Sequence, residues 1–567
     1  MAENSINSAL LRKMFLSAAA GLEVNKEWIN TLNVFPVPDG DTGTNMTLTI
    51  LSAAKEVTAL PEEPAMGDLC KAISSGSLRG ARGNSGVILS QLFRGFTKEI
   101  RQYDELDIPI LTSALVRATE TAYKAVMKPK EGTILTVARG LSDKAQALAG
   151  QDMDLETFMK TLIEEGDRVL ATTPDLLPVL KQAGVVDSGG QGLMQVLKGA
   201  MAGYLGEEVV PAPESVQIAA GAAGEGSRAQ EPQDEIRFGY SVEFLFKSAG
   251  GASVEEARAL SEYYNQIGEG AAVIAENGIR VHVHTNDPGA ALQKATADGQ
   301  ITDVRVSNLR DLTLVEVHAD VERLKAAIES EKKAAEAEAP KEESRGERKE
   351  YGFISVSCGK GLSEIFKSLG VDVVIEGGQT MNPSTDDLLC AIDKVWAKNV
   401  FILPNNSNII LAASQAKDLT KDCAVYVIPT KNVPQGVTAM INFAPENSME
   451  ENAAAMADAI STVKCGQITY AVRDTVIDGV EVHKDDYIGL DGKHILADGQ
   501  DLTEVAAQTV QKLADADSEI VSIYYGSDIT EEMVNELTKR LSEELPGVEI
   551  EVNNGGQPIY YYIVSVE

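Results

Sequence analysis

The sequence predicts a multidomain protein with an all-α helical barrel at the N-terminus, a small α+β domain in the middle and an α/β domain at the C-terminus. Its 567 residues exceed what one hydrophobic core usually holds, so three domains are expected. Two stretches that are poor in large apolar residues, 207–234 and 326–350, are interpreted as linkers. The predicted domains therefore span residues 1–206, 235–325 and 351–567.

The N-terminal domain is expected to be helical because its apolar residues recur at spacings of three and four. The pattern is clear in residues 110–118, 155–163 and 193–197. Glycine and proline loops separate these segments. Antiparallel helices joined by such loops form a bundle or barrel, and a functional site is expected at the loop end.

The middle and C-terminal domains mix strand and helix patterns. In the middle domain, residues 238–246 and 279–286 alternate like strands, and 254–264 and 288–295 have helical spacing. In the C-terminal domain, short apolar runs alternate with helices, which is typical of a parallel sheet. These runs are 351–357, 371–375, 400–403 and 424–428. Polar loops follow several of them, as in 377–385, where open α/β sheets bind ligands; ordinary helix-capping turns remain an alternative.

Two carboxylates one residue apart, Asp39 and Asp41, stand in a bend rich in proline and glycine. Hard oxygen ligands of this kind suit Mg²⁺ when it also holds nucleotide phosphates. Thr44 and Asn45 can begin a helix, whose N-terminal amides also favour phosphate. A capped turn without ligand and a calcium loop are the alternatives, although the missing further acidic positions argue against an EF-hand. The motif predicts a metal-dependent phosphoryl-transfer site.

Two further glycine-rich segments, 83–86 and 187–192, lead into apolar helices. Positions without side chains let the backbone approach an anion closely. The first segment is neither a Walker loop nor a Rossmann fingerprint. Each segment alone could be an exposed interhelical turn, but three such loops in one helical domain favour a nucleotide site.

Two of the five histidines lie in one predicted strand. The period of two places His282 and His284 on one face, a spacing that zinc can use if a neighbouring strand adds ligands. A surface or core pair without metal is an equal alternative.

Composition narrows the class of protein. The five cysteines are scattered without CxxC spacing, which predicts no disulfide framework and suits the cytoplasm. No signal segment and no window of about 18 apolar residues is found, so neither export nor stable membrane insertion is expected. A formal net charge of −35 argues against binding of nucleic acid or anionic lipid surfaces.

Four motifs resemble the ATP-binding (DhaL-type) domain of dihydroxyacetone kinases. They are Asp39-Gly-Asp-Thr-Gly-Thr-Asn-Met46, Gly80-Ala-Arg-Gly-Asn-Ser-Gly86, Glu131-Gly-Thr-Ile-Leu-Thr136 and Asp187-Ser-Gly-Gly190. The opening Asn33-Val-Phe-Pro-Val-Pro38 and the two further domains are more similar to the ATP-binding subunits of bacterial fatty acid kinases. The resemblance covers nearly the whole chain and is strongest in residues 1–205.

The resemblance implies ATP-dependent phosphorylation of a fatty acid, presented by a separate fatty-acid-binding carrier protein, to give an acyl phosphate. It implies ATP and Mg²⁺ as cofactors, and a homodimer is a candidate assembly. The first Asp of the dihydroxyacetone kinase metal cluster has no counterpart here, which leaves the number of metal ions open. The implied metal ligands are Asp39, Asp41 and Asn33, and the implied nucleotide-binding residues are Thr44, Asn45, Gly83, Asn84, Ser85, Gly86, Thr133, Asp187 and Gly189.

The resemblance also extends to the later domains. The His-x-His strand resembles a metal site that a cysteine completes, but Ser241 stands at that position. Serine is a poor zinc ligand, so tightly held zinc is not expected, although Glu243 could substitute. His282 and His284 are therefore also candidates for catalysis on the acceptor side. The C-terminal domain resembles a degenerate lipid-binding fold that docks the carrier. A phosphotransfer subunit of a ketose kinase and a noncatalytic ATP-binding scaffold remain alternative functions.

Overall fold

The computed structural model forms two compact units. One joins Met1–Gly221 to Gly346–Glu567, and the other is Ala222–Arg345. Each unit is described by itself. The described residues are 5–33, 40–126, 128–207, 209, 240–247, 260, 263–264, 267–275, 278–298, 300–308, 347–378, 382–471, 475–477, 480–492 and 494–567.

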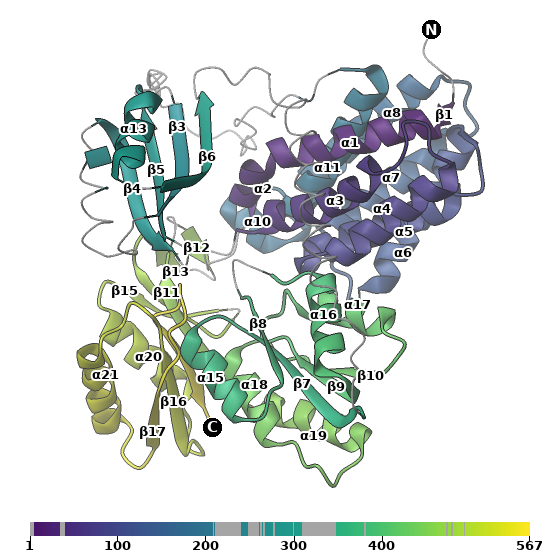
Figure 1. Ribbon diagram of the computed structural model, residues 1–567. Coiled ribbons are helices and arrows are strands. Elements are labelled where there is room, and N and C mark those ends of the chain that lie inside the picture. Colours follow the sequence, from purple (N-terminus) through teal and green to yellow (C-terminus); the bar gives the residue numbers. More distant parts are fainter. Residues whose placement is uncertain are drawn as a thin grey trace, which may run out of the picture. The chain divides into compact units, whose positions relative to one another are not determined.

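The N-terminal part of the first unit is helical (Figure 1). A short antiparallel pair, β1 (Ile6–Asn7) and β2 (Glu105–Leu106), accompanies the helices. The helices are α1 (Ser8–Val24), α2 (Lys26–Leu32), α3 (Thr42–Thr58), α4 (Met66–Gly80), α5 (Gly83–Ile100), α6 (Ile108–Ala125), α7 (Ile134–Leu148), α8 (Leu155–Ala171), α9 (Thr173–Leu176), α10 (Pro178–Ala183) and α11 (Ser188–Leu205).

These helices close into a ring. From α3 to α8 each helix packs on the next, α8 packs on α11, and α11 packs on α1, which returns to α3. The apolar stripes face the ring interior and form one core that includes Leu22, Ile50 and Phe158. Side-chain caps start several helices, because an Asn or Asp oxygen accepts from an amide three residues on, as Asn7 does from Leu10. The predicted helical barrel is confirmed.

The second unit contains a four-stranded antiparallel sheet with the order β4-β5-β3-β6. The strands are β3 (Tyr240–Lys247), β4 (Gly268–Ala275), β5 (Gly278–Thr285) and β6 (Gln300–Asn308), and α13 (Pro288–Asp298) follows β5. Val242, Phe244 and Val283 are in its core. The α+β prediction is confirmed, but β4 and β6 were not predicted, because small residues in β4 and polar residues in β6 hide the alternation. The predicted helix at 254–264 lies mostly outside the described residues.

The C-terminal part of the first unit begins with a parallel sheet of order β10-β9-β7-β8. All four strands were predicted, within a few residues at their ends. The strands are β7 (Lys349–Ser357), β8 (Val373–Glu376), β9 (Ala397–Leu403) and β10 (Ala424–Val427). The helices around it are α15 (Lys360–Ser368), α16 (Thr385–Val395), α17 (Ile410–Leu419), α18 (Val433–Ile441) and α19 (Met449–Thr462).

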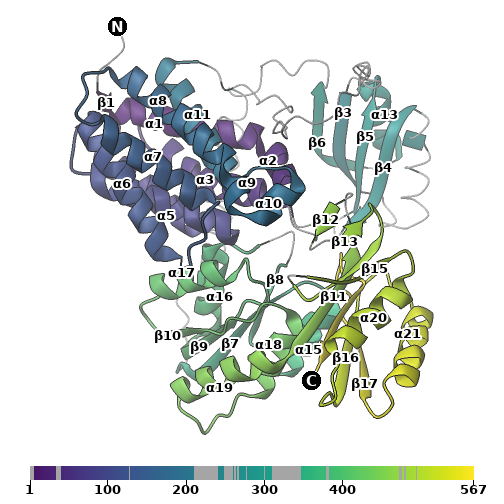
Figure 2. The same cartoon turned by 180° about the vertical axis from the view of Figure 1, so that it is seen from behind.

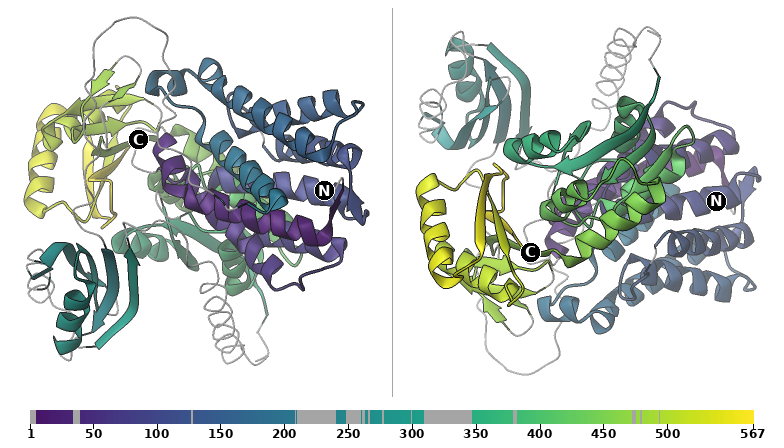
Figure 3. Two further views of the ribbon diagram at one scale, coloured as in Figure 1. Left: turned by 90° about the horizontal axis from the view of Figure 1, so that it is seen from above. Right: turned by 90° about the horizontal axis from the view of Figure 1, so that it is seen from below.

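A second sheet, of order β15-β14-β11-β18-β16-β17, completes this part (Figure 2). Both sheets can be followed in green and yellow in Figure 3. Its elements are β11 (Lys464–Tyr470), β14 (Tyr487–Leu490), β15 (Ile495–Gly499), α20 (Leu502–Leu513), β16 (Ile520–Tyr525), α21 (Glu531–Glu544), β17 (Glu549–Asn554) and β18 (Tyr562–Val566), with a hairpin of β12 (Thr475–Ile477) and β13 (Val480–Val482).

This second sheet corrects the expectation of parallel strands throughout the C-terminal domain. Only β16 and β17 pair in parallel, and the other pairs are antiparallel. The turn between β14 and β15 is far too short for the crossover that parallel strands need. The α/β class itself is confirmed, and the aromatic strand expected at the end of the chain is β18, which lies inside the sheet.

The helical ring and the parallel sheet share an apolar cluster within the first unit. Ala81 and Val87, beside the glycine loop, are buried with Leu388 of α16 and Ala412 of α17. The N–H of Thr385 donates to the carbonyl of Ala81 at 3.1 Å. The described part of the chain holds no helix that is both long and apolar enough to cross a bilayer.

Candidate functional site

Asp41 is the N-cap residue of α3, and its side chain is buried at 8% exposure. Its Oδ2 accepts a hydrogen bond from Nδ2 of Asn382 at 2.5 Å. Burial raises the pKa of Asp41 to about 6, although hydrogen bonds from the side chains of Asn45 and Asn382 favour the ionised form. A bound cation would supply the missing stabilisation of this charge.

The oxygen atoms around Asp41 fit a hard divalent cation such as Mg²⁺. Oδ1 of Asn382 is buried and lacks a hydrogen-bond partner among the described residues. No group of three His, Cys, Asp or Glu side chains gathers in the described part of the chain. The predicted ligand Asp39 lies outside the described residues, and Asn33 is the C-cap residue of α2. The described residues thus contribute one carboxylate and buried amide groups to a cation site.

The glycine loop packs directly on the start of α3. Gly83 has a φ of +56°, and a Cβ atom there would lie 2.5 Å from Nδ2 of Asn45. A Cβ atom at Gly86 would overlap Oγ1 of Thr49. These glycines therefore bring the first turn of α5 against Asn45, as a shared phosphate site requires.

Other predicted residues of this region hold neighbouring segments. Nδ2 of Asn30 donates to Oγ1 of Thr44, and the N–H of Thr44 donates back to Oδ1 of Asn30. Nδ2 of Asn84 donates to Oδ1 of Asn408 at 3.0 Å, and Ser85 is half-buried. Thr44 thus ties α3 to α2, and Asn84 ties α5 to the loop after β9.

A second group of predicted residues joins the starts of α7 and α11. Thr133 is the N-cap residue of α7, and Asp187 is the N-cap residue of α11. The carboxylate of Asp187 accepts from the N–H groups of Gly190 and Ile134. A Cβ atom at Gly189 would lie 3.3 Å from Cβ of Ile134. These residues hold two helix N-termini together.

The two groups meet at one end of the helical ring. Gly192 of α11 lies against Met46 of α3, where an added Cβ atom would be 2.5 Å from the Met46 sulfur. The N-terminal ends of α3, α5, α7 and α11 are therefore neighbours. Amide groups and helix dipoles at such ends attract phosphate. Separate motifs of the sequence thus converge on one anion-binding region beside Asp41.

His282 and His284 belong to the second unit, in β5. Their backbone positions pair with Glu243 and Ser241 of β3, and with Ala271 and Glu269 of β4. The side chains of the two histidines lie outside the described part of the structure. Their assignment to catalysis or zinc stays a prediction.

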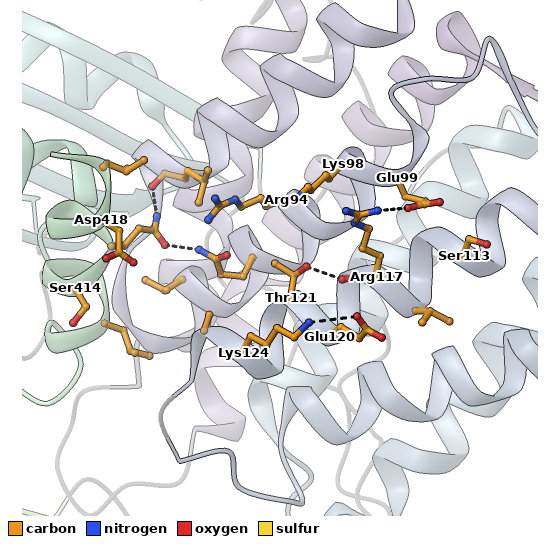
Figure 4. A pocket seen from close by; sticks show the side chains of 18 of the residues that line it. Arg94, Lys98, Glu99, Ser113, Arg117, Glu120, Thr121, Lys124, Ser414 and Asp418 are labelled. Atoms are coloured by element: carbon orange, nitrogen blue, oxygen red, sulfur yellow. Dashed lines mark hydrogen bonds and ion pairs between the residues drawn. The ribbon is translucent and has the colours of Figure 1, made fainter. Parts of the chain in front are cut away.

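A polar hollow of about 850 Å³ lies among α5, α6 and α17 (Figure 4). Arg117 is paired with Glu99 at 2.7 Å, whereas Arg94 and Lys98 pair with no carboxylate among the described residues. None of the residues predicted to bind metal or nucleotide lines this hollow. The hollow is therefore distinct from the region around Asp41.

Sequence reasoning did not identify Asn382 or Arg82 as site residues. Asn382 is 341 positions from Asp41, so no local spacing connects them. The available signal was the position of 377–385 after a parallel strand, where ligand-binding loops occur. That signal predicted a loop of interest but not the carboxylate it contacts.

We expect Asp187→Asn to raise the melting temperature relative to wild type as the pH rises from about 4 to about 7, without nucleotide. Burial raises the folded-state pKa of Asp187 from 3.8 to about 6, so the folded protein binds this proton more tightly than the unfolded chain. Its contribution to stability is present at low pH and is lost through about pH 6. The neutral amide avoids this loss, and thermal melts across the pH range would measure it.

Asp154→Asn is the matched control, because Asp154 is also an N-cap and accepts from the N–H of Thr157. That bond lowers the pKa of Asp154, which lies on the surface. The ionised form therefore stabilises the fold above the usual Asp pKa, and the control should lose relative stability as the pH rises past about 4. Parallel pH trends in the two variants would contradict the assignment.

Two solved structures illustrate what parts of the chain are similar to. One is the dihydroxyacetone kinase from C. freundii in complex with AMP-PNP and Mg²⁺, at 19% identity and a TM-score of 0.28, with 34% of each chain covered. The other is the fatty acid kinase (Fak) B3 protein from Streptococcus pneumoniae loaded with linoleic acid, at 13% identity and a TM-score of 0.28, covering 38% of this chain and 99% of that chain.

Family models and whole-length relatives identify the family. The DAK2 domain matches residues 36–202, and the FakA-like middle and C-terminal domains of fatty acid kinase match residues 237–314 and 352–567. Protein YloV of Bacillus subtilis is 40% identical over 571 residues, and an uncharacterised protein of Staphylococcus aureus (strain USA300) is 39% identical over 566 residues. Both alignments cover 100% of each chain. The chain therefore belongs to the FakA-like family of fatty acid kinase proteins.

Proposed function

We propose that this chain is the ATP-binding subunit of a fatty acid kinase. It would transfer the γ-phosphoryl group of ATP to the carboxylate of a fatty acid that a separate binding protein presents. The match to kinase-family domains along the chain supports the reaction class. The observation that carries the nucleotide site is the convergence of four helix N-termini beside the buried carboxylate of Asp41.

Each part of the region has a role in this proposal. Asp41, with Asp39 and Asn33 from the adjoining segment, would hold Mg²⁺, which neutralises charge on the transferring phosphoryl group when bound. The first-turn amides of α5, from Gly83 onward, would bind phosphate oxygens together with the start of α3. Thr133 and Asp187 would close the nucleotide pocket by holding α7 and α11 in place.

The chemistry needs no protein nucleophile. An oxygen of the fatty acid carboxylate forms a bond to the γ-phosphorus, and the bond from that phosphorus to the β,γ-bridging oxygen breaks. The products are an acyl phosphate and ADP. Carboxylic acids are ionised near neutral pH, so the acceptor needs no general base. Positioning and charge neutralisation therefore account for catalysis.

The proposal divides these tasks along the chain. Residues 1–206 would form the kinase domain, and 351–567 would dock the carrier. His282 and His284, in the domain proposed for 235–325, would serve the acceptor side or a weakly held metal. This assignment rests on their shared strand face in the sequence.

The test is to incubate the full chain with ATP, Mg²⁺ and a fatty-acid-binding protein loaded with fatty acid. Hydroxylamine converts an acyl phosphate to a hydroxamate, which can be detected directly. We expect hydroxamate only when ATP, Mg²⁺ and the loaded carrier are all present. ATP binding without any acyl phosphate would favour a noncatalytic scaffold, and phosphorylation of dihydroxyacetone would favour a ketose kinase.

A further inference from the structure

We propose that Asn382 is a positioning residue of the phosphoryl-transfer site, which orients the Asp41 carboxylate for its cation. The loop after β8 would thereby make the α/β part of the chain a component of the nucleotide site. This inference rests on the proposed function only in so far as Asp41 binds a cation together with a nucleotide. It does not depend on the identity of the acceptor.

The contact between Asn382 and Asp41 is short and buried. Nδ2 of Asn382 donates to Oδ2 of Asp41 at 2.5 Å, and the exposed fraction of Asn382 is 2%. Hydrogen bonds to a carboxylate are stronger than those between neutral groups, and removal from water strengthens them further. The bond therefore restricts the rotation of the Asp41 side chain and selects which oxygen faces a ligand.

The glycine loop itself holds Asn382 in place. Nη1 of Arg82 donates to the carbonyl of Asn382 at 2.9 Å, and Nη2 lies 3.5 Å from Oδ2 of Asp387. Asp387 is the N3 residue of the capping box that Ser384 forms at the start of α16. Thus Arg82, adjacent to Gly83 in the sequence, fixes the loop from which Asn382 reaches Asp41.

The other amide atom of Asn382 indicates what the loop faces. Oδ1 is buried and has no hydrogen-bond partner among the described residues. Leaving a buried acceptor without a donor is unfavourable, and a water molecule bound to a cation at Asp41 would provide a donor. One end of the amide would then orient the ligand carboxylate while the other accepts from the hydration shell of the cation.

Such outer contacts are effective in metal sites. Hydrogen bonds to the ligand side chains typically change metal affinity by about 10–100-fold. The effect differs from general stabilisation of the interface, because it acts on the cation and not on the fold. The two can therefore be separated experimentally.

The experiment uses the full chain with Asn382→Ala and Asn382→Leu, where leucine keeps most of the side-chain volume. Binding of ADP is titrated as a function of Mg²⁺ concentration, with no fatty acid present. We expect the half-saturating Mg²⁺ concentration to rise about 10-fold or more in both variants. Binding of ADP without Mg²⁺ and the melting temperature should change little.

Gln415→Leu is the matched control at the same interface. Nε2 of Gln415 donates to the carbonyl of Leu78 at 2.6 Å, and its Oε1 accepts from Gln91 at 3.1 Å, without contact to Asp41. This variant should keep the wild-type Mg²⁺ dependence. An unchanged dependence in the Asn382 variants, or an equal shift in Gln415→Leu, would overturn the inference. A normal Asn382 effect with no acyl phosphate formation would overturn only the proposed function.

Discussion

Asp41→Asn is expected to lower the rate of phosphoryl transfer at least about 100-fold, the magnitude that loss of one electrostatic contact to a transition state commonly produces. The substitution removes the only described carboxylate of the proposed cation site and nearly preserves side-chain shape. The protein should remain folded, because the neutral amide carries no buried charge in a site that raises the pKa of Asp41 to about 6. Hydroxamate formation and thermal melts would measure the two effects.

Asp167→Asn is the control for the loss of one negative charge from the same domain. Asp167 pairs with Lys198 at 2.9 Å, and both side chains are well exposed to solvent. Surface pairs of this kind contribute little to stability, so activity and melting temperature should stay close to wild type. Near-normal activity in Asp41→Asn would remove Asp41 from the proposed cation site.

Gly83→Ala should weaken binding of Mg-ATP by roughly tenfold or more, which corresponds to about 1.4 kcal/mol. The φ of +56° is unfavourable for alanine by about 1–2 kcal/mol. In addition, the new methyl group would lie 2.5 Å from Nδ2 of Asn45, so either Asn45 or the first turn of α5 must move. Both belong to the proposed phosphate site, and calorimetric titration of Mg-ATP would detect the change.

Gly184→Ala separates backbone strain from displacement of the site. Gly184 has a φ of +66°, and an added Cβ atom would meet nothing within 4 Å. The two alanine variants should therefore lose similar stability from strain, while only Gly83→Ala loses affinity for Mg-ATP. Equal weakening in both would mean that strain spreads through the domain and that the contact with Asn45 is unimportant.

Local patterns in the sequence predicted most of the helical domain. The 3.6-residue periodicity and the cap residues identified α8 and α11, and the expected helix after Thr44 is α3, which begins at Thr42. The four parallel strands of the C-terminal part were also predictable, since each is a short apolar run. The antiparallel sheet that follows was not, because strand direction depends on connections and pairing partners that a local pattern does not contain.

The candidate site was predicted in composition but not in arrangement. Glycine loops and carboxylates mark the N-termini of α3, α5 and α11, because the demands of close backbone approach appear directly in residue type. The contact of Asn382 with Asp41 joins segments 341 positions apart, and an isolated asparagine in a loop carries no signal for its partner. The role of Asn84 toward Asn408 was unpredictable for the same reason.

The shared apolar cluster of the first unit has a consequence during protein synthesis. Arg82 and its acceptor Asn382 are 300 positions apart, so at about 5–20 residues per second the ribosome needs roughly 15–60 s to make the chain between them. Through that interval the surface at Ala81 and Val87, which is buried in the finished protein, has no covering partner. The nascent helical domain would therefore present a sticky patch beside its own nucleotide loop, where chaperones are expected to bind until α16 and α17 emerge.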